Sequence, residues 1–286
     1  MKPVERVLNV LGHRTRYLEA APGEPARAVV FVHGFAGRAE MWAPNLSIIG
    51  AKHRAIAPDL LGHGATAKPS EGSYSMDTYA DFLLAFLDEA DIDSCALVGS
   101  SMGGLVAGMA AARQPRRFDA LVLADSAGLG RLSPAAQARY VRYFFETALF
   151  GPSEERLRKF WEDNIYRDPK KIPRTAIRRG IEVWTNTDSR RSLTKTGRAL
   201  YLVHKSLLPV LPDIPIRKAF FWGEHDPQFP VAYAKAAQEA NPGSELVTFD
   251  AGHLPNLEVP EEFNRALLRF LNGAKPSKAV REAEAR

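Results

Sequence analysis

Short apolar runs alternate with amphipathic segments along most of this chain. Two runs near the start, residues 4–10 and 14–19, predict an antiparallel hairpin that turns around Gly12 and His13. Further apolar runs at 28–32, 54–59, 120–124, 217–222 and 245–249, and one ending at Leu97 and Val98, predict buried strands. Apolar residues at helical spacing predict a helix over 77–90, and the alanine-rich segment 105–113 predicts another. Further helices are expected over 41–49, 231–240 and 261–271.

The alternation breaks from about residue 131 to residue 212. This stretch has amphipathic helical pieces and six prolines, at positions 134, 152, 169, 173, 209 and 212, but no convincing strand. An insertion of that size between two apolar strands predicts a helical cap over the sheet. We therefore expect a core formed by residues 1–130 and 213–272, a cap of residues 131–212, and a flexible tail over 273–286.

Strands that alternate with helices predict an α/β fold. Its central sheet is expected to be mostly parallel, with helices on both faces, because continuous apolar strands must be covered on both sides. Ligands bind such sheets at the carboxyl ends of the strands. The candidate chemical groups of this chain all follow predicted strands.

Composition indicates an ordinary globular protein of 286 residues, with 45% hydrophobic and 25% charged residues. No apolar run approaches the roughly 18–20 residues that span a bilayer, and the N-terminus lacks the apolar core of a signal peptide, so we expect a cytoplasmic protein without a membrane partner. Cys95 is the single cysteine, which excludes an intramolecular disulfide and a cysteine-based metal cluster. We predict neither a metal nor a cofactor.

Positive charge is concentrated in the cap. The whole chain carries a net charge of +5, while residues 131–210 hold 17 Lys and Arg against 8 Asp and Glu. The basic residues are scattered and accompany no nucleic-acid-binding motif, so no nucleic-acid partner is expected. Two interpretations stay open for the charge, the solvated faces of several helices or attraction of an anionic substrate.

The segment Ala96-Leu-Val-Gly-Ser-Ser-Met-Gly-Gly-Leu105 joins a predicted strand to a predicted helix. Gly99 and Gly103 stand two residues before and two after Ser101, where a side chain would collide with the opposite arm of a tight turn. The frame selects Ser101 over Ser100, because position 98 is Val. The pattern predicts an exposed serine nucleophile, which needs a base, an acid and oxyanion donors.

Two backbone amides are candidates for an oxyanion hole. The glycine-rich loop His33-Gly-Phe-Ala-Gly37 follows a strand, and we expect the Phe35 amide to donate one hydrogen bond. Met102, directly after the nucleophile, is expected to donate the other.

His253 is the strongest candidate for the base. The segment Asp250-Ala-Gly-His-Leu-Pro255 directly follows the last predicted strand, which puts His253 at the active edge of the sheet. His33 and His63 stand in glycine-rich loops and are interpreted as structural hydrogen-bonding groups.

Two aspartates could orient the imidazole, since both follow strands and both give the chain order Ser, Asp, His. Asp226 stands in a Gly223-x-x-Asp226 turn followed by Pro227, which is the form expected of an acid-bearing loop. Asp125 is the rival and is interpreted as bonding to nearby backbone.

Together these motifs resemble the α/β-hydrolase fold family over about residues 4–271. The resemblance implies a Ser101, His253, Asp226 triad, with the Phe35 and Met102 amides as the oxyanion hole. Serine at the turn argues against the haloalkane dehalogenase and epoxide hydrolase branches, which use aspartate there. The motifs that carry the resemblance are His33-Gly-Phe35, Asp59-Leu-Leu-Gly-His-Gly64, Gly99-Ser-Ser-Met-Gly-Gly104, Gly223-Glu-His-Asp226 and Gly252-His253.

The predicted function is hydrolysis of a small carboxylic ester or lactone through an acyl-enzyme. Carbon–carbon bond hydrolysis of meta-cleavage products is the alternative, in which Arg190 or Arg191 would clamp an acidic acyl substrate. Many members of that branch have Gly-His-Trp at the base, whereas this chain has Gly252-His-Leu254. The cap residues Phe144, Phe145, Trp161 and Trp184 are predicted to line an apolar pocket. A ligand receptor on the same fold is the alternative outside enzymes.

Overall fold

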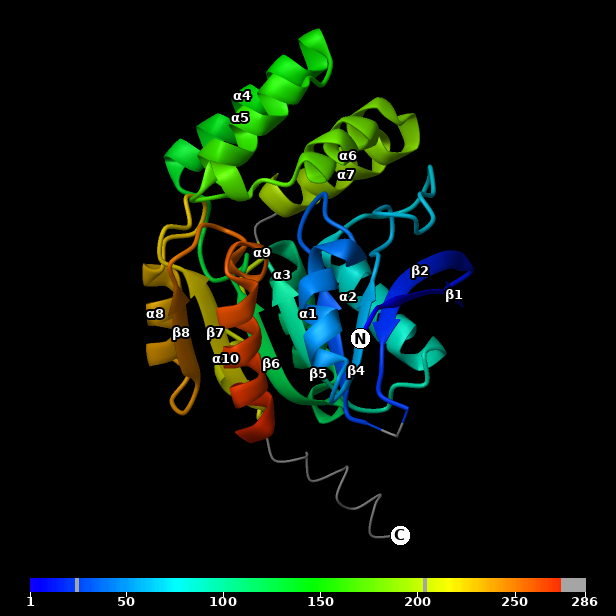
Figure 1. Cartoon of the computed structure of the whole chain (residues 1–286), viewed down its shortest axis with the longest axis vertical. Helices are drawn as coiled ribbons and strands as arrows, with labels where there is room; N and C mark the ends of the chain where they lie inside the picture. The colour runs from blue at the N-terminus through cyan, green and yellow to red at the C-terminus, as the bar shows by residue number, and fades with distance from the viewer. Residues whose placement is uncertain (24–25, 203–204, 274–286) are drawn as a thin grey trace, which may run out of the picture.

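The computed structural model describes residues 1–23, 26–202 and 205–273. The described strands form one eight-stranded sheet in the order β1-β2-β4-β3-β5-β6-β7-β8 (Figure 1). The first two neighbouring pairs, β1 with β2 and β2 with β4, are antiparallel, and the others are parallel. The predicted, mostly parallel α/β sheet is therefore confirmed. The strands are β1 (Val4–Val10), β2 (His13–Ala20), β3 (Ala28–Val32), β4 (Arg54–Pro58), β5 (Cys95–Ser100), β6 (Phe118–Ala124), β7 (Arg217–Gly223) and β8 (Glu245–Phe249).

The opening hairpin turns one residue earlier than the sequence predicted. His13 pairs with Val10 inside the ladder, so Leu11 and Gly12 form the turn. Both turn residues have positive φ, 51° and 80°, as the favoured two-residue hairpin turns require.

Helices cover both faces of the sheet. On one face pack α2 (Met76–Glu89), α3 (Met102–Arg113) and α8 (Ala232–Glu239), and on the other α1 (Ala43–Ile49) and α10 (Pro260–Gly273). Successive residues of β3 enter the two cores alternately: Val30 and Val32 face α2 and α3, while Val29 and Phe31 face α1 and α10. This two-sided burial explains the continuous apolar strands of the sequence.

Several helices differ from the predicted ranges at their ends. The helix predicted over 105–113 begins at Met102, because α3 starts immediately after the turn at Ser101. The helix predicted over 41–49 begins as a 3₁₀ turn, Ala39–Trp42, before α1. Gly273, assigned to the tail, ends α10, and the rest of the predicted flexible tail lies outside the described residues.

Four long helices make up most of the cap, and they lie above the carboxyl ends of the strands (Figure 1). They are α4 (Pro134–Phe150), α5 (Glu154–Asn164), α6 (Arg174–Thr185) and α7 (Thr187–Leu202). Between 131 and 212 the described residues form no strand, as predicted. Within the described ranges, no helix combines the length and the apolar character that a bilayer crossing requires.

Candidate active site

Ser101 stands at a strained turn between β5 and α3. Its φ of 54° and ψ of −122° are rare for a residue with a side chain, and its N–H donates to the Ala124 carbonyl at 2.9 Å. A Cβ on Gly99 would lie 2.3 Å from the Gly103 oxygen, so the predicted collision with the opposite arm holds there. It does not hold for Gly103, whose Cβ would lie 2.2 Å from the carbonyl oxygen of Val32 on the neighbouring strand β3.

The two adjacent serines differ in exposure. Ser101 lines a cavity, whereas Ser100 is 1% exposed and its buried hydroxyl has no hydrogen-bond partner among the described residues. Ser101 is therefore the serine that a substrate in the cavity can reach.

The loop that follows β3 packs directly against Ser101. A Cβ on Gly34 would lie 3.1 Å from the Cβ of Ser101, so a larger residue would crowd the nucleophile. The next residue, Phe35, lines the cavity, and Met102 is fully buried at the start of α3. Met102 thus adjoins Ser101 in the chain and Phe35 follows a residue that packs against it, and the role of their amides as oxyanion donors stays a prediction.

His33 and His63 serve as structural groups, as predicted. The His33 ring donates from Nδ1 to the Gly34 carbonyl at 2.8 Å, and its Nε2 accepts the Leu60 N–H at 3.0 Å. Burial lowers the pKa of His33 to about 4, so the ring is neutral and Nε2 is free to accept. Burial likewise lowers the pKa of His63 to about 3, and its Nδ1 lies 3.0 Å from the Leu61 carbonyl.

His253 and Asp226 form a buried hydrogen-bonded pair. The Nδ1 atom of His253 lies 2.8 Å from Oδ2 of Asp226, and the two residues are 3% and 8% exposed. The other carboxylate oxygen of Asp226 accepts the backbone N–H groups of Gln228 at 2.7 Å and Phe229 at 3.2 Å. The carboxylate is thus held from one side and orients the imidazole on the other.

Asp125, the rival acid, lies beside this pair. Its Oδ1 accepts the Gly223 N–H at 2.8 Å, which confirms the predicted bond to backbone. One ligand atom of each of Asp125, Asp226 and His253 lies within 4.8 Å of the others. Burial, and then the negative charge of Asp226, raise the pKa of Asp125 well above its usual value.

Hydrogen bonds already occupy part of the ligand atoms in each of two clusters of possible metal ligands. In the buried cluster, both oxygens of Asp226 already accept hydrogen bonds. In an exposed cluster, His225 contacts Asp250 at 3.1 Å and Glu224 accepts the Thr248 hydroxyl at 2.7 Å.

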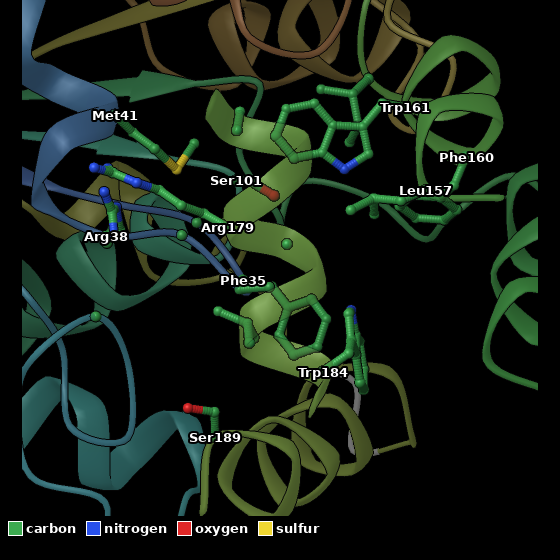
Figure 2. Close-up of a pocket in the computed structure, with 18 of the residues that line it drawn as sticks. Phe35, Arg38, Met41, Ser101, Leu157, Phe160, Trp161, Arg179, Trp184 and Ser189 are labelled. Carbon is green, nitrogen blue, oxygen red and sulfur yellow. The ribbon is translucent and has the colours of Figure 1, made fainter. Parts of the chain in front are cut away.

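A cavity of about 810 Å³ lies between the sheet edge and the cap, and both Ser101 and His253 line it. In Figure 2, Ser101 lies between aromatic side chains, with Phe35 and Trp184 on one side and Trp161 on the other. The candidate base and nucleophile therefore share one cavity, whose lining includes several aromatic side chains. Three predicted substrate-binding residues, Phe144, Trp161 and Trp184, line it.

Residues 27–260 match the model of the alpha/beta hydrolase fold family. The chain belongs to this family. It is 30% identical over 276 residues to the dihydrolipoyllysine-residue acetyltransferase component of the acetoin cleaving system of Pseudomonas putida, covering 94% of this chain and 70% of the relative. It is 26% identical over 241 residues to 3-oxoadipate enol-lactonase 2 of Acinetobacter baylyi, covering 84% of this chain and 86% of the relative.

Solved structures share the fold of this α/β hydrolase. One is the 2-hydroxy-6-oxo-6-phenylhexa-2,4-dienoate hydrolase of Rhodococcus sp. strain RHA1, with a TM-score of 0.84 and 22% identity. The match covers 95% of this chain and 99% of that one. At that identity the likeness establishes the fold alone.

The prediction of substrate binding is wrong for three residues of this α/β hydrolase, because they do not line the cavity. Phe145 is 63% exposed, because the α4 turn that directs Phe144 inward directs its neighbour to solvent. Arg190 and Arg191 do not line the cavity, and the Arg191 guanidinium pairs with Asp188 at 2.7 Å. The buried side of α7 is instead formed by small and apolar side chains, namely Ser189, Ser192, Leu193 and Thr196.

Two other arginines, which the sequence analysis missed, do line the cavity: Arg38 and Arg179. In the view of Figure 2 both side chains extend beside Met41, on the side of Ser101 away from Trp161. Arg179 shares a face of α6 with Ala176 and Val183, which also line the cavity. A helical-wheel projection of α6 would have revealed Arg179, because it places this residue on the same face as Ala176 and Val183.

The sequence analysis also missed a hydrogen-bonded chain from the cap to the acid loop. The Tyr140 hydroxyl of α4 donates to the side-chain oxygen of Gln228 at 2.8 Å, and Gln228 donates from its side chain to the Asn164 carbonyl at 2.9 Å. The backbone N–H of Gln228 donates to Asp226, so this one residue connects the cap to the acid loop. Further aromatic residues that the sequence did not single out also line the cavity: Tyr143, Phe160, Tyr166 and Tyr201.

Proposed function

We propose that this α/β hydrolase cleaves a small carboxylic ester or lactone through an acyl-enzyme on Ser101. The observation that supports this most is the shared cavity, which exposes Ser101 and the His253 imidazole to one substrate while Asp226 holds the imidazole from behind. This is the arrangement that a serine nucleophile requires.

In the proposed first step, His253 takes the hydroxyl proton of Ser101 through Nε2 as the oxygen attacks the substrate carbonyl. The Nδ1–H group stays bonded to Asp226, which stabilises the imidazolium that forms. The amides of Phe35 and Met102 stabilise the oxyanion, a contribution typically worth on the order of 3 kcal/mol for each donor. The imidazolium then protonates the departing oxygen, and the ester or lactone C–O bond breaks.

In the second step, His253 removes a proton from water, which attacks the acyl-serine. The C–O bond to Ser101 breaks, the serine recovers its proton from the imidazolium, and the carboxylic acid leaves. From a lactone, the acid and the alcohol remain one molecule. The names of two relatives, an acetyltransferase component and an enol-lactonase, both denote chemistry at an acyl group and support this class.

Carbon–carbon hydrolysis of an acidic dienoate is the second candidate, and the two cavity arginines favour it. Arg38 and Arg179 offer guanidinium groups that can bind a carboxylate through paired hydrogen bonds. One nitrogen of Arg38, Nη2, is buried and has no hydrogen-bond partner among the described residues.

A substrate panel separates these functions. Esters of increasing acyl length, one lactone and one dienoate are each incubated with the wild-type protein and with Ser101→Ala. Ester or lactone hydrolysis that disappears in Ser101→Ala supports the proposed function. Cleavage of the dienoate alone supports the second candidate. Ligand-induced thermal stabilisation without turnover of any compound supports a receptor and contradicts both enzymatic functions.

A further inference from the structure

A second buried carboxyl group lies behind the proposed triad. Asp125 directly follows β6 and Asp226 follows β7, the neighbouring strand, so the sheet brings the two side chains together. Asp125 is fully buried, and while its Oδ1 accepts the Gly223 N–H, its Oδ2 has no hydrogen-bond partner among the described residues. A buried carboxylate oxygen without a hydrogen-bond donor costs free energy, so the protonation state of Asp125 requires an explanation.

The surroundings of the two carboxyl groups are unequal. Asp226 accepts three hydrogen bonds, from Gln228, Phe229 and His253. Asp125 accepts one, from Gly223. The titratable groups that face Asp125 are Asp226 from the β7–α8 loop, His253 from the β8–α9 loop and Glu258 from α9 (Pro255–Glu258).

Two carboxylates this close in a buried site do not both ionise, and the less well-solvated one keeps its proton. Burial and the charges of Asp226 and Glu258 raise the pKa of Asp125, and the single hydrogen bond from Gly223 opposes them. The proton on Asp125 needs an acceptor, and the Asp226 carboxylate is the adjacent one.

We propose that Asp125 is a positioning residue that stays protonated and donates a hydrogen bond to the Asp226 carboxylate. Only one negative charge then faces His253, and the Asp226 carboxylate is fixed from a direction that the backbone N–H groups do not cover. A second anion at this position would favour the charged imidazole, which cannot act as a base. The consequence for turnover rests on the proposed function, whereas the protonation of Asp125 does not.

Asp125→Asn tests the charge of the group without changing its shape. The asparagine amide can donate to Asp226 while its oxygen accepts the Gly223 N–H, so we expect the acidic limb of the pH profile of kcat/KM to stay in place. Asp125→Ala has no donor, and we expect kcat to fall about 10- to 100-fold. If Asp125 were ionised in the wild-type protein, Asp125→Asn would remove a charge and shift the acidic limb downward by about one pH unit or more, which would overturn the proposal.

Infrared spectroscopy tests the protonation without any substrate. At neutral pH the wild-type protein should show the carbonyl stretch of a neutral carboxylic acid that is missing from Asp125→Asn. Asp119→Asn is the matched control, because Asp119 lies near the opposite end of the same strand and pairs with Arg27. This variant should keep the band. No difference between wild type and Asp125→Asn overturns the proposal even in an active enzyme. A difference in a protein without turnover supports it while the proposed function fails.

Discussion

The backbone N–H of His253 donates a hydrogen bond to the carbonyl oxygen of Ile165, with the two atoms 2.7 Å apart. Ile165 follows α5, so this bond joins the base loop of the core to the cap. Glu258 adds one more link between them, because its Oε1 accepts the Gly252 N–H of the base loop at 2.8 Å and its Oε2 accepts the Arg167 N–H of the cap at 2.9 Å. The position of the imidazole therefore depends on how the cap is docked.

Gly252→Ala should lower kcat about 100-fold in a folded protein. A Cβ at this position would lie 2.4 Å from the Ile165 oxygen, which forces the cap and the base loop apart, and a displacement of about 1 Å at a catalytic group can cost that much. Steady-state kinetics on the best ester of the panel measures the effect. Gly23→Ala is the control, because its Cβ would meet nothing within 4 Å. Wild-type kcat in Gly252→Ala would contradict this coupling.

Gly99→Ala should destabilise the fold by about 1–3 kcal/mol, because the new Cβ would lie 2.3 Å from the Gly103 oxygen inside the turn. Urea unfolding followed by circular dichroism gives the free energy of unfolding. Gly23→Ala should stay within about 0.5 kcal/mol of wild type. Equal stability of the two variants would show that the turn can relax.

The sheet and the place of the candidate site could be predicted because the signals are local. Each apolar strand is visible as a run, and a glycine-rich or acidic loop follows it. Parallel strands bring their carboxyl ends to one edge, so Ser101, Asp226 and His253 could be expected together without any knowledge of their distances.

Other features depend on packing between distant segments. The rotation of a cap helix about its axis decides whether Phe144 or Phe145 enters the cavity, and two adjacent aromatic residues do not reveal it. The same holds for Arg190, which faces away while Arg179 of the preceding helix lines the cavity. The contact of Gly103 with Val32 joins helix α3 to strand β3, which are far apart in the chain.

Acid should destabilise this protein partly through its buried neutral histidines. Burial lowers the pKa of His63 to about 3 and that of His33 to about 4, so below pH 6.5 the unfolded chain binds protons that the folded chain does not. The contribution of these histidines to the free energy of unfolding is complete above about pH 6.5. It is lost as the pH falls toward 4, by about 1.4 kcal/mol per pH unit for each histidine. The free energy of unfolding in urea at pH 7, 6 and 5 measures this slope.

His63→Asn isolates one of these contributions. The asparagine amide can still donate to the Leu61 carbonyl, but it takes up no proton. The slope of stability against pH should fall by about 1.4 kcal/mol per pH unit. Parallel curves for wild type and variant would show that His63 is not the neutral buried group described above.

Arg179→Met should separate acidic from neutral substrates. Loss of a charge-assisted hydrogen bond to a carboxylate should lower kcat/KM for an acidic acyl compound about 10- to 100-fold, while a neutral ester of similar size is hydrolysed as before. Arg191→Met is the matched control, since Arg191 does not line the cavity and should leave both rates unchanged. Equal losses for the two compounds would assign Arg179 to packing.

The most direct measurement is covalent labelling of the folded protein with a fluorophosphonate, followed by mass spectrometry of its peptides. The hydroxyl that the cavity exposes should take up one phosphonyl group, and ester hydrolysis should decline in proportion to the labelling. Ser100→Ala should label like wild type, because that hydroxyl is buried, whereas Ser101→Ala should neither label nor turn over. Undiminished hydrolysis by Ser101→Ala, or full activity in protein that carries the label on Ser101, would contradict the account.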